Sequence, residues 1–109
     1  MKESPLFVKT YDFLIWISNH VSHFPKSERF RLAKRIEDKS FEFYETIIHA
    51  ARNHEERKAY LMVADESLYM LKVYMRLAKE RGFSSPLQYQ YASEKVIEMG
   101  KLLGGWVKT

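Results

Sequence analysis

The stretch that decides the fold begins at Tyr60 and ends at Ala78, and it reads YLMVADESLYMLKVYMRLA. Apolar residues recur in it every three or four positions, which is the spacing along one face of an α-helix. Two such series run side by side: Leu61, Ala64, Leu68, Leu71, Met75 and Ala78, and then Tyr60, Val63, Ser67, Met70, Tyr74 and Leu77. A helix with two adjacent apolar series needs partners over a broad face, so this stretch predicts an all-α protein.

The composition of the whole chain agrees with that prediction. Its 109 residues include only four glycines and three prolines, too few turn residues for an all-β domain. The hydrophobic content of 46% is too high for a disordered chain, and the length suits a single domain over residues 1–109. The absence of cysteine excludes disulfides and thiolate metal sites. No apolar run reaches the roughly 18 residues of a membrane span, and the opening MKESP does not resemble a signal peptide. We therefore expect a cytoplasmic protein with no membrane contact.

Prolines and capping residues set the first two helix boundaries. The first helix should end before Pro25, because the residue that precedes a proline avoids the α conformation. Ser27 is the expected N-cap of the second helix. Asn53 followed three residues later by Glu56 resembles a capping box, so a third helix should begin there.

The last boundaries are marked by glycines and a further capping box. Gly82 can adopt the left-handed conformation that ends a helix. Ser85, Pro86 and Gln88 have the order expected of an N-cap, a first helical residue and the third residue of a capping box. The glycine pair at 104–105 should end the fourth helix and let the chain fold back. The expected helices span about 6–23, 28–52, 55–81 and 86–103.

The apolar patterns of the other helices support a bundle. The second helix carries Phe30, Ala33, Ile36, Phe41, Tyr44, Ile47, Ile48 and Ala51 at helical spacing. Short connections between long helices favour an antiparallel up-down-up-down four-helix bundle. The first and third helices carry more apolar residues than an isolated bundle needs. That excess indicates either a well-filled core or a flank that meets another subunit, and the aromatic content of 15% favours the second alternative.

Catalytic or metal-binding patterns are nearly absent from the sequence. There is no phosphate-binding glycine loop, no nucleophile elbow and no Glu-x-x-His motif of the kind that holds two iron ions in a bundle. His20 and His23 lie one helical turn apart but have no third ligand. Glu45 and His49 have the spacing of an ordinary surface contact. We therefore expect no enzyme activity, no metal and no cofactor.

Basic residues fall into two short blocks, although the net charge is only +4. The first basic stripe consists of Arg31, Lys34, Arg35 and Lys39, and the second consists of Lys72, Arg76, Lys79 and Arg81. Each stripe follows one side of a helix, which is the spacing needed to contact a phosphate backbone. The alternative is a solvated face that is partly neutralised by Glu37, Asp38 and Glu80. Because consecutive helices run antiparallel, the two stripes should approach each other at one end of the bundle, where they could merge into one patch.

Three segments resemble a known family. Residues 24–30 read FPKSERF, residues 71–78 read LKVYMRLA and residues 99–108 read MGKLLGGWVK. The first resembles the opening of the second helix in a group of small bacterial four-helix bundles. The other two, together with Ser85 through Tyr89, resemble segments of the Avd proteins, the accessory variability determinants of diversity-generating retroelements, although Lys72 stands where an arginine is common. The Avd proteins belong to a wider group of bacterial four-helix bundles that includes proteins encoded in 23S ribosomal RNA intervening sequences. Residues 44–50 read YETIIHA, which differs from the SIPSNIAEG-like segment of the ribosomal branch.

The resemblance covers residues 11–108 and implies both an assembly and a function. It implies a homopentameric ring that binds the retroelement reverse transcriptase and nucleic acid, either RNA or DNA, and that supports mutagenic reverse transcription and retrohoming. The accessory protein is not itself the polymerase. The alternative is a structural or ribosome-associated bundle of the 23S intervening-sequence type. Trp106 is expected to cover the end of the bundle or, alternatively, to lie at an interface.

Overall fold

The computed structural model describes residues 4–109, and all the expected helices are present. They are α1 (Pro5–Val21), α2 (Leu32–Arg52), α3 (Arg57–Glu80) and α4 (Pro86–Val107), and a short 3-10 helix, η1 (Lys26–Glu28), precedes α2. Residues 4–109 contain no strand. The prediction of an all-α protein is therefore confirmed.

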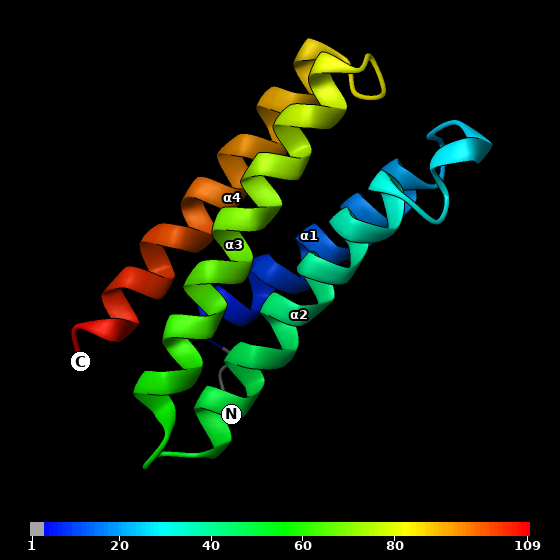
Figure 1. Ribbon diagram of the computed structural model, residues 1–109. Coiled ribbons are helices and arrows are strands. Elements are labelled where there is room, and N and C mark those ends of the chain that lie inside the picture. Colours follow the sequence, from blue (N-terminus) through cyan, green and yellow to red (C-terminus); the bar gives the residue numbers. More distant parts are fainter. Residues whose placement is uncertain (1–3) are drawn as a thin grey trace.

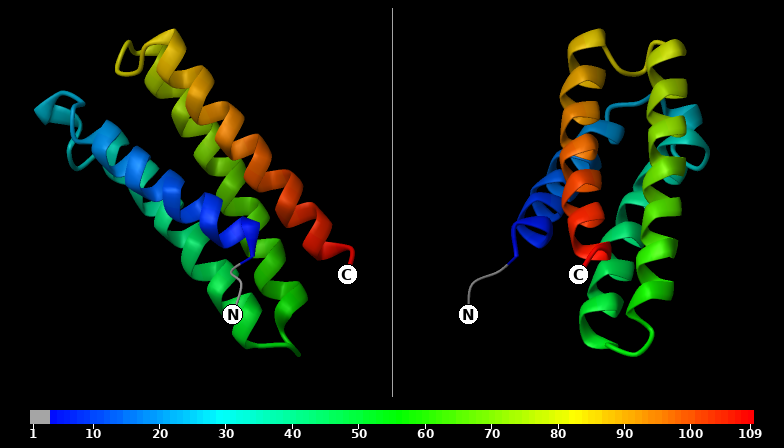
Figure 2. Two further views of the ribbon diagram at one scale, coloured as in Figure 1. Left: turned by 180° about the vertical axis from the view of Figure 1, so that it is seen from behind. Right: turned by 90° about the vertical axis from the view of Figure 1, so that its left-hand side faces the viewer.

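The helices surround a single core in the expected up-down-up-down order. Both α1 and α3 pack against α2 and against α4, so α1 and α3 lie diagonally across the bundle. The α1–α2 and α3–α4 connections lie at one end of the molecule, and the α2–α3 turn lies at the other (Figure 1, Figure 2). The molecule measures 42 × 24 × 23 Å. We call the end with the two connections the connection end.

The first apolar series of α3 forms the centre of the core, whereas the second does not. All six residues of the first series are buried, among them Leu71, which has no exposed surface. In the second series only Ser67 is buried, and Val63 and Leu77 are exposed. From α2, Phe43 and Ile47 complete the core with no exposed surface. Part of the apolar excess on α3 therefore faces outward.

The start of α2 differs from the prediction. Ser27 lies within η1 and caps nothing, and the helix begins at Leu32, four residues later than expected. The carboxylate of Glu28 is buried instead and accepts a hydrogen bond from the backbone N–H of Leu32, at 3.4 Å. A side chain from the preceding turn thus satisfies one free N–H of the helix end. Because residues 29–31 form a turn outside the helix, Phe30 is 80% exposed and is not part of the core.

The capping box predicted at Asn53 is also wrong. The Asn53 amide donates to the carbonyl of His49, so it caps the end of α2. The Arg57 side chain donates to the carbonyl of Ala50 at 2.9 Å and supports the same helix end. The α3 helix begins at Arg57 without a side-chain cap. Two side chains therefore satisfy carbonyls at the end of α2.

The predictions around the start of α4 are confirmed, and the predicted end is wrong. Gly82 has φ +80°, and Ser85 and Gln88 make both hydrogen bonds of the capping box. The helix continues through the glycine pair at 104–105 to Val107. The chain does not fold back, and Trp106 packs across the bundle against Phe7 of α1, with ring centroids 6.1 Å apart. The indole helps to cover that end of the core.

Candidate nucleic-acid interface

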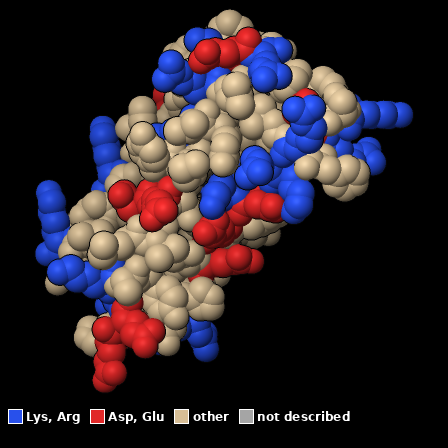
Figure 3. All heavy atoms as spheres, in the orientation of Figure 1, with Lys and Arg blue, Asp and Glu red and all other residues tan. Residues whose placement is uncertain are grey.

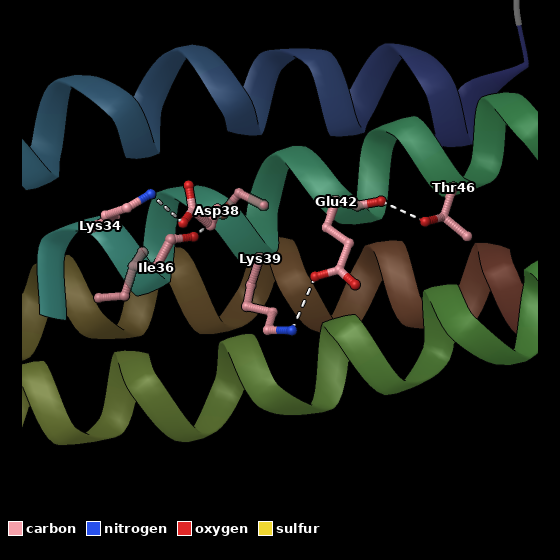
Figure 4. Close-up of polar contacts among 7 residues, drawn as sticks. Lys34, Ile36, Asp38, Lys39, Glu42 and Thr46 are labelled. Carbon is pink, nitrogen blue, oxygen red and sulfur yellow. Dashed lines mark hydrogen bonds and ion pairs between the residues drawn. The ribbon is translucent and has the colours of Figure 1, made fainter. Parts of the chain in front are cut away.

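Within the first basic stripe, Lys39 points toward α3, whereas Lys34 lies on another side of α2 (Figure 4). Arg31 lies in the turn before the helix. The Lys39 ammonium donates a hydrogen bond to Glu42 at 2.9 Å (Figure 4), and this bond is the main reason that the pKa of Lys39 is raised. Arg35 lies one helical turn before Lys39 on the same side. Arg35 and Lys39 therefore border the groove between α2 and α3.

Acidic neighbours partly neutralise the first stripe. Lys34 pairs with Asp38 at 2.8 Å (Figure 4), as expected, and Lys39 pairs with Glu42, which the sequence interpretation missed. Arg31 lies 3.9 Å from Glu28. Within residues 4–109, Arg35 is the one member of this stripe that makes no ion pair. Exposed ion pairs contribute little free energy, so phosphate groups can compete with these carboxylates.

The second basic stripe lies on the other side of α3, facing α4. The ammonium of Lys79 sits 5.0 Å from the ring centroid of Tyr89 on α4. Lys72 lies two turns earlier on the same side of the helix, and Arg76 lies between them. Arg76 pairs with Glu80 at 3.1 Å in an exposed position, as expected. Three basic side chains of this stripe therefore border the groove between α3 and α4.

The two stripes share one end of the bundle, and most of their residues border different sides of α3. On α3, Tyr60 stacks on His49 of α2 at 5.4 Å and so marks the side that faces α2. Tyr74 lies on that side of α3 too. Lys72 comes two residues before Tyr74, which places it about 200° around the helix, on the opposite side of α3. Arg81 lies seven residues after Tyr74, so it belongs to the side that faces α2. The exposed side chain of Val73 lies between the two stripes.

The surface nevertheless carries its basic groups close together at the connection end. Figure 3 shows blue side chains gathered there, with red ones among them, and a largely tan surface over the middle of α3. Lys26 and Arg29 belong to this region, because η1 and the following turn lie at that end (Figure 1). Neither residue belongs to the two predicted stripes. Their position became clear only with the turn that holds them.

Potential metal ligands do not gather at one place among the described residues. Residues 4–109 contain no group of three or more potential metal ligands. His20 and His23 do not converge, because His20 is hydrogen-bonded to Ser84 and His23 to the carbonyl of Asn19. No helix within these residues is long and apolar enough to cross a membrane. The candidate site is thus the charged surface at the connection end.

Comparison with known proteins places the chain in a family. A family model described as bAvd-like matches residues 6–109. Among solved structures, the chain is similar to a protein of unknown function from the S23 ribosomal protein family of Bacteroides thetaiotaomicron VPI-5482. The TM-score is 0.87 and the identity 19%, over 95% of this chain and 96% of the other. That likeness shows a shared fold. No curated protein matches the chain. Because the family model covers nearly the whole sequence, the chain belongs to the bAvd-like family.

Proposed function

We propose that this protein is the non-catalytic accessory protein of a diversity-generating retroelement. It binds the element's reverse transcriptase and nucleic acid, and it supports mutagenic reverse transcription and retrohoming. The observation that carries this proposal is the match to the bAvd-like family over residues 6–109. Two basic stripes at one end of the bundle are consistent with a role in binding.

Nucleic acid would be held through its phosphates. In residues 4–109, Arg35 and Lys72 make no ion pair, and Arg76 makes only an exposed one. When such groups bind phosphates, they release counterions. The affinity for nucleic acid therefore depends strongly on the salt concentration and little on the base sequence. The two grooves beside α3 would each present one stripe to the phosphate backbone. All eight predicted residues are retained in this proposal: Arg31, Lys34, Arg35, Lys39, Lys72, Arg76, Lys79 and Arg81.

Self-association is supported by two apolar faces on opposite sides of the bundle. On α1, Val8, Tyr11 and Ile15 point away from the core and are 41%, 55% and 60% exposed. On α3, an outward face carries Met62, Tyr69 and Val73. We call these the α1 face and the α3 face. Because α1 and α3 lie diagonally across the bundle, the two faces point in opposite directions.

Opposite apolar faces suit a head-to-tail assembly. When the face of one subunit meets a different face of the next, the contact repeats, and it closes into a ring if the rotation permits. A homopentamer is the ring that the family resemblance implies. Five copies of a chain of charge +4 carry +20, so assembly turns a mildly basic subunit into a strongly basic ring.

The alternative function is that of a structural or ribosome-associated bundle of the 23S intervening-sequence type. The fold that the chain shares with the S23-family structure favours this alternative only at the level of architecture. The neighbouring genes distinguish the two functions. A reverse transcriptase gene with a template repeat supports the first, and an insertion within a 23S gene supports the second.

A reconstituted reaction tests the proposed function. The reverse transcriptase, its template RNA and nucleotides are combined with and without this protein, and the mutagenised complementary DNA is sequenced. The protein should be required for that product, and alone it should show no polymerase or nuclease activity. Equal synthesis in its absence would contradict the proposal.

A further inference from the structure

Phe30 is the most exposed large apolar side chain of the described residues, at 80%. It lies in the turn between η1 and α2, at the connection end of the bundle (Figure 1). A phenylalanine ring in this position loses the free energy that burial in the core would give it. The surrounding turn therefore holds the ring in this exposed position.

The turn holds Phe30 outward by hydrogen bonds on both sides of it. Backbone bonds run from Glu28 to Pro25, from Arg29 to Lys26 and from Arg31 to Glu28. The buried Glu28 carboxylate accepts the Leu32 N–H, which fastens the turn to α2. The ring therefore projects from a preformed support, and a ligand that binds it pays little conformational entropy for ordering the turn.

Basic residues flank this ring in the sequence. The segment 26–35 contains the basic residues Lys26, Arg29, Arg31, Lys34 and Arg35. Its one acidic residue is Glu28, whose carboxylate is occupied by the helix end. Blue side chains accordingly dominate the right-hand tip of Figure 3, where the α1–α2 connection lies. Lys26 and Arg29 also border a hollow of about 450 Å³ between this turn, α1 and α2, which Glu37 lines too and Phe30 does not.

We propose that Phe30 is a stacking platform for an unpaired base of single-stranded nucleic acid. The flanking arginines and lysines contact the phosphates on either side of that base. An exposed aromatic ring within a basic groove is the combination that proteins use to bind single strands. In a duplex the faces of the bases are already stacked on each other, so the ring has nothing to stack on. The inference deepens the proposed function, since it rests on nucleic-acid binding at this end.

The test measures binding of three fluorescein-labelled probes of equal length. They are a single-stranded oligothymidylate, the same strand with abasic sugars, and a blunt duplex. The variants are Phe30→Ala, Phe30→Trp and, as a matched control, Leu87→Ala. Leu87 is 77% exposed on α4 and has no arginine or lysine beside it in the sequence. Circular dichroism confirms that each variant folds.

Phe30→Ala should weaken binding of the oligothymidylate by about fivefold or more, the smallest effect expected from the loss of one stacked base. Binding of the abasic strand and of the duplex should change by less than about twofold, because their phosphate contacts remain. Phe30→Trp should bind the oligothymidylate with the same affinity as the unaltered protein does. The oligothymidylate should quench the fluorescence of the introduced tryptophan, and the abasic strand should not. Leu87→Ala should behave as the unaltered protein does.

Several outcomes would overturn the stacking role. Unchanged affinity of Phe30→Ala for the oligothymidylate would do so, as would an equal loss for all three probes. Loss of reverse transcriptase capture with unchanged affinity for the strand would assign Phe30 to a protein contact instead. If the unaltered protein binds none of the probes, the nucleic-acid part of the proposed function fails as well. If it binds them and only Phe30 is neutral, the stacking role alone fails.

Discussion

The imidazole Nε2 of His20 lies 2.7 Å from the hydroxyl oxygen of Ser84. This hydrogen bond joins the last turn of α1 to the α3–α4 connection, at the end that carries the basic stripes. The His20 ring also stacks on Trp16 at 4.7 Å and meets the edge of Phe24 at 5.3 Å. Burial in this cluster lowers the pKa of His20, and the charge of His23 lowers it further. The neutral imidazole therefore links the end of α1 to the α3–α4 connection.

Acid should loosen this end of the bundle. The unfolded chain takes up a proton at His20 near pH 6.5, whereas the folded protein takes it up only at lower pH. As the pH falls below about 6.5, the unfolded state binds more protons, so the free energy of unfolding decreases. Thermal melting at pH 8 and pH 5.5 should show a larger loss for the unaltered protein than for His20→Gln.

An exposed histidine provides the control for the pH experiment. His54 lies in the α2–α3 connection, at the other end of the bundle, and His54→Gln is the matched control variant. If His20→Gln loses as much stability in acid as the unaltered protein does, the buried imidazole is not the group responsible.

Charge reversal in either basic stripe should weaken nucleic-acid binding. Arg35→Glu and Arg76→Glu each remove one phosphate contact and add repulsion, and each should flatten the salt dependence. The slope of log affinity against log salt is about −0.7 to −0.9 per contacted phosphate. A salt titration of labelled RNA and DNA measures this, while light scattering checks that the assembly is intact.

The chain offers a closely matched control for the second stripe. Lys72→Glu alters the stripe, and Lys58→Glu makes the same change on the same side of α3, four turns away at the opposite end. Lys72→Glu should weaken binding more than Lys58→Glu does. Unchanged affinity in intact assemblies of all the stripe variants would mean that the stripes are only a solvated surface.

Two glycine substitutions should change stability in opposite directions. Gly82 has φ +80°, where a β-carbon is strained, so Gly82→Ala should lower the free energy of unfolding by about 1 kcal/mol. Gly105 lies within α4, and a β-carbon there would have no atom within 4 Å. Gly105→Ala should raise the free energy of unfolding by about 0.5–1 kcal/mol, because alanine favours the helix. Urea denaturation measures both. A loss of stability in Gly105→Ala would show that something packs closely against that position.

Assembly should depend on the α1 and α3 faces. Light scattering should give about five times 13.0 kDa for the purified protein. Ile15→Glu or Val73→Glu places a carboxylate in the apolar contact, and either should yield folded monomers. Leu87→Glu, on neither face, should leave the assembly unchanged. A clean monomer of the unaltered protein at micromolar concentration would refute the ring.

Local chemistry explains which parts of the fold were predictable. Ser85, Pro86 and Gln88 form their cap from neighbouring residues alone, so the pattern identified the start of α4. Asn53 had the spacing of a cap as well, but the end of α2 competed for the same amide. The α4 helix crosses its two glycines because Trp106, beyond them, packs on the core. Tertiary contacts of that kind leave no short-range signal in the sequence.

The candidate site was predictable as two stripes but not in its arrangement. Helical spacing placed Arg35 and Lys39 together, and Arg76 and Lys79 together. The groove that each stripe borders depends on tertiary contacts, such as that of Lys79 on α3 with Tyr89 on α4. The apolar pattern of the second helix includes Phe30. Nothing local in the sequence shows that Glu28 is buried and that α2 therefore begins only at Leu32.

Co-purification with the neighbouring reverse transcriptase is the direct test of whether this protein is that enzyme's partner. The neighbouring reverse transcriptase carries an affinity tag, both proteins are expressed together, and the purified complex is weighed by light scattering after nuclease treatment. A stable complex that contains five copies of this protein is expected. Recovery of the tagged enzyme alone, with this protein in the unbound fraction, would contradict it.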